Sequence, residues 1–384
     1  MINITKLLKG RGTISEVLKY SSYMSRSIKP ELIRFSEKSR PVVIWNITWR
    51  CNLNCLHCYV PTNIGNSVEL HTEDVFQVIS ELVDMKIPLL ILSGGEPLLR
   101  PDILDIIKFA SECGLRVGLS TNGTLINRNM VRRLAEAGVA YIGISLDGAS
   151  RYTHDYIRGV KGAYERALNG IRNCLKYNIK TGIRTIISKR TINEIPQIID
   201  IATRLGVSRL CFYHIVPTGR GKEYISENIS NEERVKLIAF LCEVASLYDA
   251  TEILTVCNPA DGVYVYKYAA ERDEELSKII YKLLKASGGC SAGTKICCIG
   301  PDGSVYPCQF MNEYPVGNIL KSSLKEIWSD DNDLLKPIRD RRLLKGKCGK
   351  CEYRDICGGC RVRAYYYNGS YLAFDPGCYV YDGS

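Results

Sequence analysis

The sequence predicts an α/β fold in which a parallel sheet with helical crossovers is followed by a small cysteine-rich domain. Three observations predict it. Short apolar runs alternate with helix-period segments between residues 41 and 219. Nine of the 17 cysteines lie between Cys290 and Cys378. From Ser287 onward glycine, proline and tyrosine become frequent and the periodicity fades.

The strand–helix repeats follow a polar, basic lead-in that covers residues 1–40. Buried parallel strands read as continuous apolar runs. Six such runs occur, at residues 42–47, 89–92, 115–119, 139–146, 183–187 and 210–216. Parallel strands need right-handed crossovers, but the pattern leaves open whether the sheet is open, doubly wound or a partial barrel. In each case functional residues are expected beyond the carboxyl ends of the strands.

Between these runs, apolar residues recur at the spacing of helices that pack one face on a sheet. The segments are residues 75–83, 103–110, 167–175 and 195–202. Thr72 is the expected N-cap of the first helix, and Gly114 is expected to close the second. Residues 220–286 read as a mainly helical bridge. Residues 287–384 form a domain that lacks a large core and therefore needs metal ligation to fold.

Composition limits the class of protein. The chain has 384 residues, of which 46% are hydrophobic and 24% charged. No apolar run approaches the ~20 residues of a membrane span, and the first forty residues lack the apolar core of a signal peptide, so we expect a cytoplasmic protein. The formal net charge is +10, but Lys and Arg are spread along the chain. We therefore expect no nucleic-acid partner, whereas a small acidic substrate or a solvated basic surface both remain open.

Cys51, Cys55 and Cys58 come directly after the first predicted strand. Three thiolates within eight residues can bind three irons of a cuboidal cluster. The fourth iron then lacks a protein ligand, and an open metal position is typical of a catalytic site. The alternative is a zinc site that takes His57 as its fourth ligand.

The Cys-x3-Cys-x2-Cys spacing, with His57 at the aromatic position, resembles the motif of the radical S-adenosylmethionine (SAM) superfamily. Three further segments at strand ends resemble that family: residues 93–97 (Ser-Gly-Gly-Glu-Pro), 120–123 and 145–148. Taken singly, Asn-Gly and Asp-Gly are ordinary turns. The resemblance implies a partial parallel (β/α)6 barrel and a [4Fe–4S] cluster whose open iron binds SAM. A 5′-deoxyadenosyl radical then abstracts hydrogen from the substrate. The cofactor contacts it implies are His57, Gly94, Gly95, Glu96, Ser120, Asn122, Ser145, Asp147 and Arg158.

The C-terminal cysteines resemble the seven-cysteine SPASM iron–sulfur domain, although two residues rather than three separate Cys357 from Cys360. The resemblance implies one auxiliary cluster and a second that is completed by Cys297, Cys298 or substrate. The implied ligands are Cys348, Cys351, Cys357 and Cys378 for the first and Cys290, Cys308 and Cys360 for the second. Zinc ribbons or disulfides are the alternatives. Five cysteines stand apart from both motifs, namely Cys113, Cys174, Cys211, Cys242 and Cys257.

Residues 41–48, 210–221 and 357–364 resemble the haem-biosynthesis branch of the superfamily. This implies removal of two acetate side chains from didecarboxysiroheme, with an electron donor such as ferredoxin or flavodoxin. Substrate carboxylates suit bidentate pairs with arginine. The candidates are Arg184, Arg220, Arg361 and Arg363, and His154 or His214 could ligate a substrate iron.

Three other functions remain open from the sequence. An oxidative decarboxylase of coproporphyrin propionates shares the same cofactors. A peptide maturase needs a leader-binding module, for which the lead-in is short and poor in strand pattern. A non-enzymatic iron–sulfur electron carrier does not need residues 94–96 or 120–123.

Overall fold

Eleven strands form one open sheet in the computed structural model, which describes residues 1–11, 40–63, 68–247 and 250–380. Their order across the sheet is β1-β8-β7-β6-β5-β4-β3-β2-β9-β10-β11. The strands are β1 (Ile2–Asn3), β2 (Val42–Asn46), β3 (Leu90–Ser93), β4 (Val117–Thr121), β5 (Tyr141–Ser145), β6 (Thr181–Ile187), β7 (Arg209–His214), β8 (Glu252–Val256), β9 (Ile296–Ile299), β10 (Ser304–Tyr306) and β11 (Gly317–Asn318).

Strands β2 to β8 are parallel and adjacent in chain order. The six predicted apolar runs correspond to β2 through β7, so the expected parallel α/β fold is confirmed. The sheet does not close, because β1 and β11 form its two edges. The carboxyl ends of the parallel strands β2 to β8 lie along one rim of the sheet, where the sequence analysis expected a shared site.

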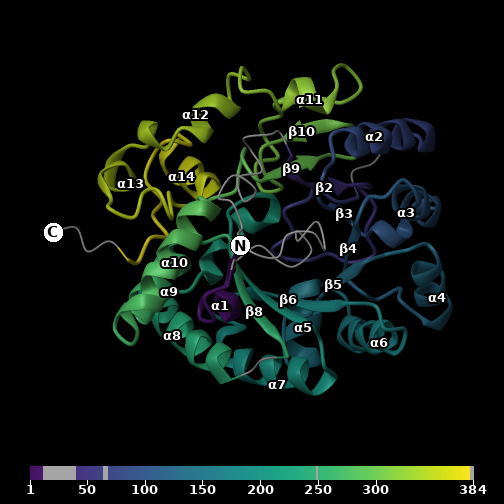
Figure 1. The fold of residues 1–384 in the computed structure, drawn as a ribbon. Helices are drawn as coiled ribbons and strands as arrows, with labels where there is room; N and C mark the ends of the chain where they lie inside the picture. Colours follow the sequence, from purple (N-terminus) through teal and green to yellow (C-terminus); the bar gives the residue numbers. More distant parts are fainter. Residues whose placement is uncertain (12–39, 64–67, 248–249, 381–384) are drawn as a thin grey trace.

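The helices lie around the outside of the parallel strands (Figure 1). Those of the strand–helix repeats bury apolar stripes against the sheet, as Val75, Ile79 and Leu82 do in α2. They are α2 (Thr72–Asp84), α3 (Ile103–Glu112), α4 (Arg128–Glu136), α5 (Arg151–Arg158), α6 (Ala163–Lys176) and α7 (Ile195–Leu205). The others are α1 (Ile4–Leu7), α8 (Asn231–Leu247), α9 (Ala260–Ala270), α10 (Glu274–Ser287), α11 (Leu324–Ile327), α12 (Leu335–Arg339), α13 (Gly346–Lys350) and α14 (Arg361–Asn368).

The start of α2 differs from the prediction. His71 rather than Thr72 is the N-cap residue. The Thr72 hydroxyl instead donates to Asp102 Oδ2 at 2.7 Å, which ties the start of α2 to the start of α3. Gly114 follows α3 with φ of 87°, as its predicted role as a helix terminator requires.

Two segments join the main sheet where the sequence suggested otherwise. The expected helical bridge contains β8, which pairs in parallel with β7. The cysteine-rich segment contributes β9, which pairs in parallel with β2 and thereby extends the main sheet. In the lead-in, β1 pairs antiparallel with β8 and α1 follows. Residues 12–39 of the lead-in lie outside the described residues.

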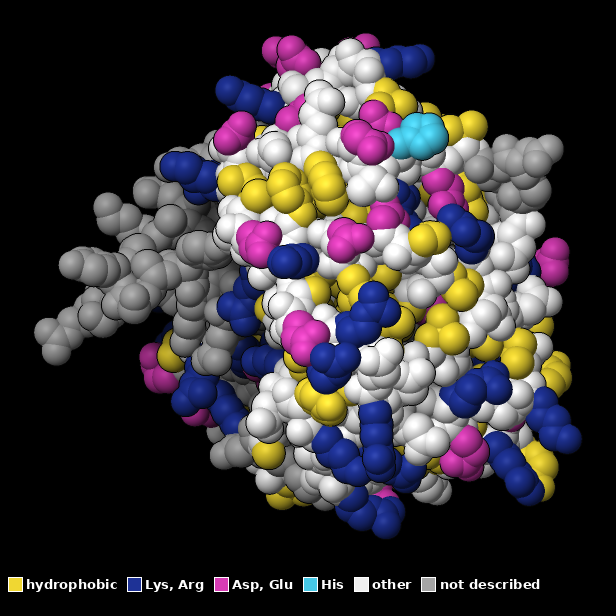
Figure 2. All heavy atoms as spheres, turned by 90° about the vertical axis from the view of Figure 1, so that its right-hand side faces the viewer, with side chains coloured by type: hydrophobic (Ala, Val, Ile, Leu, Met, Phe, Trp, Pro, Cys, Tyr) yellow, Lys and Arg dark blue, Asp and Glu magenta, His cyan; other side chains and the backbone are white. Residues whose placement is uncertain are grey.

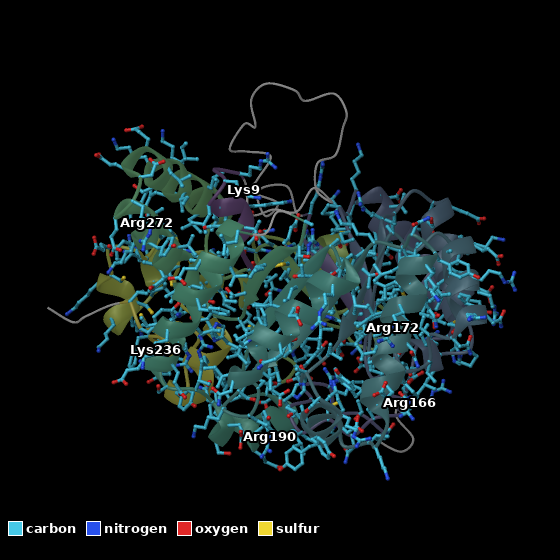
Figure 3. The ribbon with its side chains drawn as sticks, turned by 90° about the horizontal axis from the view of Figure 1, so that it is seen from below. Lys9, Arg166, Arg172, Arg190, Lys236 and Arg272 are labelled. Carbon is cyan, nitrogen blue, oxygen red and sulfur yellow. The ribbon has the colours of Figure 1, made fainter. Side chains whose placement is uncertain are left out.

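The basic residues are dispersed over the surface. Figure 2 shows Lys and Arg mixed with Asp and Glu on one face of the molecule. Figure 3 labels six basic side chains at the periphery, among them Arg166 and Arg172 of α6 and Lys236 of α8. Among the described residues, no helix combines the length and apolar character needed to cross a bilayer.

Candidate active site

A cavity of about 400 Å³ is lined by residues of the sheet and by residues that follow the carboxyl ends of its strands. The residues that follow each strand converge on it: Cys51 after β2, Gly94 after β3, Asn122 after β4 and Asp147 after β5. Its opposite wall is made by C-terminal residues, including Cys290, Cys308 and Cys360. One cavity therefore faces both cysteine motifs.

The three cysteines of the first motif form part of a small buried cluster. Cys55 is buried, and Cys51 and Cys58 are half-buried beside Leu53 and Ala163. Burial, together with the neighbouring Cys55 and Cys58 thiols, raises the pKa of Cys51 to about 12. Arg158 Nη1 donates to Cys55 Sγ at 3.5 Å. Three adjacent thiols beside a cationic donor fit an iron–sulfur cluster, whose positive irons favour the thiolate form.

Two glycines let the end of β3 pack directly on the cysteine loop. A Cβ at Gly95 would lie 2.1 Å from the carbonyl oxygen of Arg50, and one at Gly94 would lie 2.7 Å from that of Thr48. Neither position has room for a side chain. The backbone amides of Gly95 and Glu96 donate to those same carbonyls, at 2.9 and 2.7 Å. The Gly-Gly pair therefore fixes the cysteine loop against the sheet.

The side chain of Glu96 does not line the cavity, contrary to its expected contact with the SAM ammonium. Glu96 is fully buried. Its Oε1 accepts from Thr121 Oγ1 at 2.7 Å and from the Leu98 amide at 3.1 Å, and its Oε2 accepts from the Asn122 amide at 2.8 Å. Both carboxylate oxygens are thus used inside the protein, where they join the end of β3 to the end of β4.

Ser120 and Asn122 do line the cavity. Ser120 Oγ accepts from Ser93 Oγ at 3.1 Å and contacts Arg184 Nη1. Asn122 Nδ2 donates to Asn52 Oδ1 at 2.8 Å, which ties β4 to the cysteine loop. Ser145, at the end of β5, completes this side of the cavity.

Asp147 links four elements from a buried position. Its Oδ2 forms an ion pair with Arg158 and lies 3.6 Å from His57 Nε2, while its Oδ1 accepts from the Ile186 amide at 2.7 Å. Burial disfavours the Asp147 carboxylate, but Arg158 and His57 outweigh this and lower its pKa. His154 Nδ1 accepts from the Asp147 amide at 3.0 Å. The predicted set of His57, Asp147 and Arg158 is therefore one electrostatically coupled unit beside Cys55.

Both histidines of this unit are neutral at neutral pH. Burial lowers the pKa of His57 to about 4, against the opposing effect of Asp147. Burial and the Arg158 cation together lower the pKa of His154 to about 4. The permanent charges beside the three cysteines therefore include those of Asp147, Arg158 and Arg220.

Of the four arginines predicted to bind substrate, only Arg184 lines the cavity. The Arg361 Nη1 donates to the carbonyls of Tyr371 and Ala373, at 2.6 and 2.8 Å. Arg363 is fully buried and forms a bidentate ion pair with Asp375 at 2.7 and 2.8 Å. Arg220 donates to the Cys55 carbonyl at 2.8 Å. These three guanidinium groups make contacts within the protein, and their role in binding substrate stays a prediction.

His214 stands at the cavity wall, at the end of β7. Its Nε2 lies 2.9 Å from Asp261 Oδ2, and Asp261 Oδ1 accepts from the Tyr379 hydroxyl at 2.7 Å. Its Nδ1 is buried and has no partner among the described residues. A carboxylate that orients one ring nitrogen and leaves the other unpaired is typical of a metal-ligating histidine. His154, the other candidate, is not among the lining residues.

The C-terminal cysteines separate into two groups in space. Cys348, Cys351, Cys357 and Cys378 line a small cavity of about 20 Å³ of their own. Cys290, Cys308 and Cys360 line the large cavity. Cys297 and Cys298 lie in β9 and are buried in the sheet, and neither lines a cavity. Two groups of thiols fit two auxiliary clusters.

Several lining residues escaped the sequence analysis, among them Tyr213, Lys295 and Cys257. Tyr213 lies in a predicted strand and lines the cavity beside His214, although adjacent strand residues ordinarily point to opposite faces. Cys257 follows a strand that the sequence analysis did not identify. Lys295 precedes β9, whose place in the sheet was equally unforeseen.

Comparisons with known proteins agree with this geometry. The radical SAM superfamily model matches residues 45–202, and the SPASM iron–sulfur cluster-binding domain matches residues 290–361. An Fe-coproporphyrin III synthase of Methanosarcina barkeri is 39% identical, covering 99% of this chain and 98% of the relative. An AdoMet-dependent heme synthase of the same organism is 37% identical over 88% of this chain and 95% of its own length. A pre-heme d1 synthase of Dinoroseobacter shibae is 36% identical over 95% and 92%.

Solved structures share the fold. SuiB of Streptococcus suis bound to S-adenosylmethionine superimposes with a TM-score of 0.71 at 21% identity, covering 88% of this chain and 77% of that one. The anSMEcpe protein with bound AdoMet gives a TM-score of 0.67 at 20% identity, covering 88% and 93%. The chain belongs to the radical SAM superfamily: it is a SAM-dependent enzyme of the haem-biosynthesis branch with a [4Fe–4S] core and a C-terminal SPASM domain for auxiliary iron–sulfur clusters.

Proposed function

We propose that this enzyme removes the two acetate side chains of didecarboxysiroheme and so forms iron-coproporphyrin III. The observation that carries the proposal is the 39% identity to an Fe-coproporphyrin III synthase along nearly the whole of both chains. The large cavity supports it, because it lies between the first three cysteines and the C-terminal thiols and offers both polar and apolar walls.

At the first cysteine motif, each residue has a distinct task. Cys51, Cys55 and Cys58 hold the cluster, and Gly94 and Gly95 bring backbone to the cofactor. Ser120, Asn122, Ser145, Asp147, His57 and Arg158 hold SAM and the loop around it. When bound, the cluster and SAM supply the 5′-deoxyadenosyl radical that abstracts hydrogen from the substrate. A reduced ferredoxin or flavodoxin supplies the electron.

On the substrate side, Arg184 and His214 are the principal residues. Arg184 is held by Ser120 and by the Gly143 carbonyl, so its guanidinium is fixed before a substrate carboxylate arrives. His214 is oriented by Asp261 and offers Nδ1 to the substrate iron. A tetrapyrrole with several carboxylates and a central iron uses both groups.

A second function is supported by the 37% identity to an AdoMet-dependent heme synthase. Such an enzyme would decarboxylate propionate side chains oxidatively to vinyl groups. It shares the cofactors and the carboxylate contacts, and differs in the carbon from which hydrogen is removed. The two reactions change the mass of the substrate differently.

The deciding experiment is mass spectrometry of anaerobic reactions that contain reconstituted protein, SAM, dithionite and one iron tetrapyrrole. Loss of two acetate groups from didecarboxysiroheme is expected. Loss of carboxyl carbon with desaturation of iron-coproporphyrin III would instead identify the decarboxylase. The Cys51→Ala, Cys55→Ala, Cys58→Ala triple variant is the control and should form neither product nor 5′-deoxyadenosine. If neither tetrapyrrole reacts and a peptide does, the chain is a peptide maturase.

A binding measurement tests the contact between Arg184 and the tetrapyrrole independently of catalysis. Arg184→Met should weaken iron-coproporphyrin III binding about tenfold, because a charge-assisted hydrogen bond contributes roughly 1.5–3 kcal/mol. Arg166→Met, on the outer surface of α6, should leave binding unchanged. Titration followed by absorbance gives both constants, and equal affinities in the two variants would remove Arg184 from the site.

A further inference from the structure

Cys257 lies against the three cysteines of the large cavity, although more than thirty residues separate it from them in the sequence. Half-buried Cys257, Cys290 and Cys308 pack around buried Cys360 in one small apolar cluster. All four thiols line the same cavity. No such position was expected for Cys257, which follows β8 and belongs to neither cysteine motif.

A buried polar chain holds Cys257 beside Cys360. The neighbouring Asn258 accepts from Arg363 Nη2 at 3.2 Å, and Arg363 pairs with Asp375 at 2.7 Å. Asp375 Oδ2 in turn accepts from the Cys360 amide at 2.7 Å. Asn258, Arg363 and Asp375 are each buried. The end of β8 is thus fastened to the start of α14, and the two cysteines are brought together by fixed contacts.

The four thiols lie close enough together to act on one another, since they pack in one cluster and line one cavity. Thiolates gathered in this way repel, so a charged form of all four requires a cationic centre between them.

The two cysteines expected to complete this group are used elsewhere. Cys297 is fully buried in the main hydrophobic core. Cys298 Sγ accepts from Asn46 Nδ2 at 3.6 Å, inside the sheet between β9 and β2. By contrast, the backbone of Cys257 has φ of 71°, a left-handed conformation that only three other described non-glycine residues adopt. Such outliers persist where the surrounding structure requires them.

We propose that Cys257, Cys290, Cys308 and Cys360 together ligate one auxiliary [4Fe–4S] cluster, so that none of its irons is open. The cluster then cannot bind substrate directly, and its part in the reaction is to transfer electrons. The assignment does not depend on which tetrapyrrole is the substrate.

The test is carried out in the full chain with Cys51, Cys55 and Cys58 changed to Ala, so that every remaining cluster is auxiliary. Iron and acid-labile sulfide are counted after anaerobic reconstitution, and the EPR spectrum of the reduced protein is recorded with and without cyanide. The parent should show no response to cyanide, because each cluster has four thiolates. Adding Cys257→Ala should either remove the iron of one cluster or yield a cluster whose EPR spectrum shifts with cyanide.

Three controls make the result decisive. Cys298→Ala tests the rival ligand, and Cys242→Ala tests a buried cysteine of α8 that lines no cavity. Both should match the parent in iron content and EPR spectrum. Cys257→Ser, which keeps a weak ligand and nearly the same volume, guards against misfolding of the Ala variant. A parent that already responds to cyanide, or a Cys257→Ala variant identical to the parent, would overturn the assignment.

Discussion

Asp147 is the buried carboxylate that neutralises the cation of its neighbour Arg158. It pairs with Arg158, whose side chain is only 10% exposed, and approaches His57. Changing Asp147 to Asn leaves the Arg158 cation buried without its counter-charge, which costs about 3–5 kcal/mol. Urea unfolding should show this loss. Glu136→Gln, which breaks an exposed ion pair with Arg132, should change the free energy of unfolding by less than about 1 kcal/mol. Similar losses in both variants would contradict the role given to Asp147.

His154 makes the stability of the protein depend on pH. Its pKa falls from 6.5 to about 4 on folding, so below pH 6.5 the unfolded chain binds the extra proton. Stability is therefore full above pH 6.5 and falls as the pH drops toward 4, by up to roughly 3 kcal/mol. His154→Asn keeps an acceptor for the Asp147 amide and removes the titration. Between pH 6.5 and 4, the free energy of unfolding of the parent should fall relative to that of the variant. A constant difference would show that His154 does not titrate there.

For individual arginines, the sequence showed which side chains carry charge but not where their hydrogen-bond and ion-pair partners lie. Arg361 and Arg363 stand next to Cys360, and the excess of basic residues made them reasonable substrate contacts. Their partners, the Tyr371 carbonyl and Asp375, come from a turn about ten residues further along the chain. Arg184 differs because it lies within a predicted strand, where the alternation of side chains indicates the face it occupies.

Among the elements, β2 through β7 were predictable and β8 and β9 were not. β2 and β3 are almost continuous apolar runs, whereas β8 carries Glu252 and Thr255 and follows a long helix. β9 reads Ile-Cys-Cys-Ile, and its cysteines were two of the candidates to complete the second auxiliary cluster, but they are buried in the sheet as small apolar residues. The missing strand β8 is the reason that Cys257 could not be placed beside the other cysteines from the sequence.

The close contact between the end of β3 and the cysteine loop should make SAM cleavage sensitive to a side chain at Gly95. Gly95→Ala places a Cβ 2.1 Å from the Arg50 carbonyl, so the loop that carries Cys51 must move. We expect cleavage of SAM to 5′-deoxyadenosine to fall by at least about 100-fold, as displacements near 1 Å can cause, while auxiliary iron is retained. Gly118→Ala in β4 meets only ordinary contacts, at 3.7 Å and beyond, and should cleave SAM at the parent rate. Normal cleavage by the Gly95 variant would show that the loop tolerates displacement.

Across the whole molecule, the C-terminal region is divided between the sheet and the cluster segments. β9 is hydrogen-bonded between β2 and β10, so it shares the stability of the main sheet. The segment that carries Cys348, Cys351 and Cys357 contains only the short helices α12 and α13 and a small cavity lined by thiols. The sequence assigned the whole of residues 287–384 to metal-dependent folding. We expect that dependence to be confined to the part beyond β11, because β9 and β10 belong to the main sheet.

Limited proteolysis should reveal this division. Removing iron with a chelator takes ligation free energy from the segment around Cys348, where the core is smallest. Trypsin should then cut first at exposed Lys345, Lys347 and Lys350, while the bond after Lys295 stays protected by β9. A Cys348→Ala, Cys351→Ala double variant should give the same fragments without chelator. The Cys51→Ala, Cys55→Ala, Cys58→Ala triple variant should resist trypsin as the parent does. First cuts at Lys295, or within the parallel strands, would mean that the clusters stabilise the entire sheet.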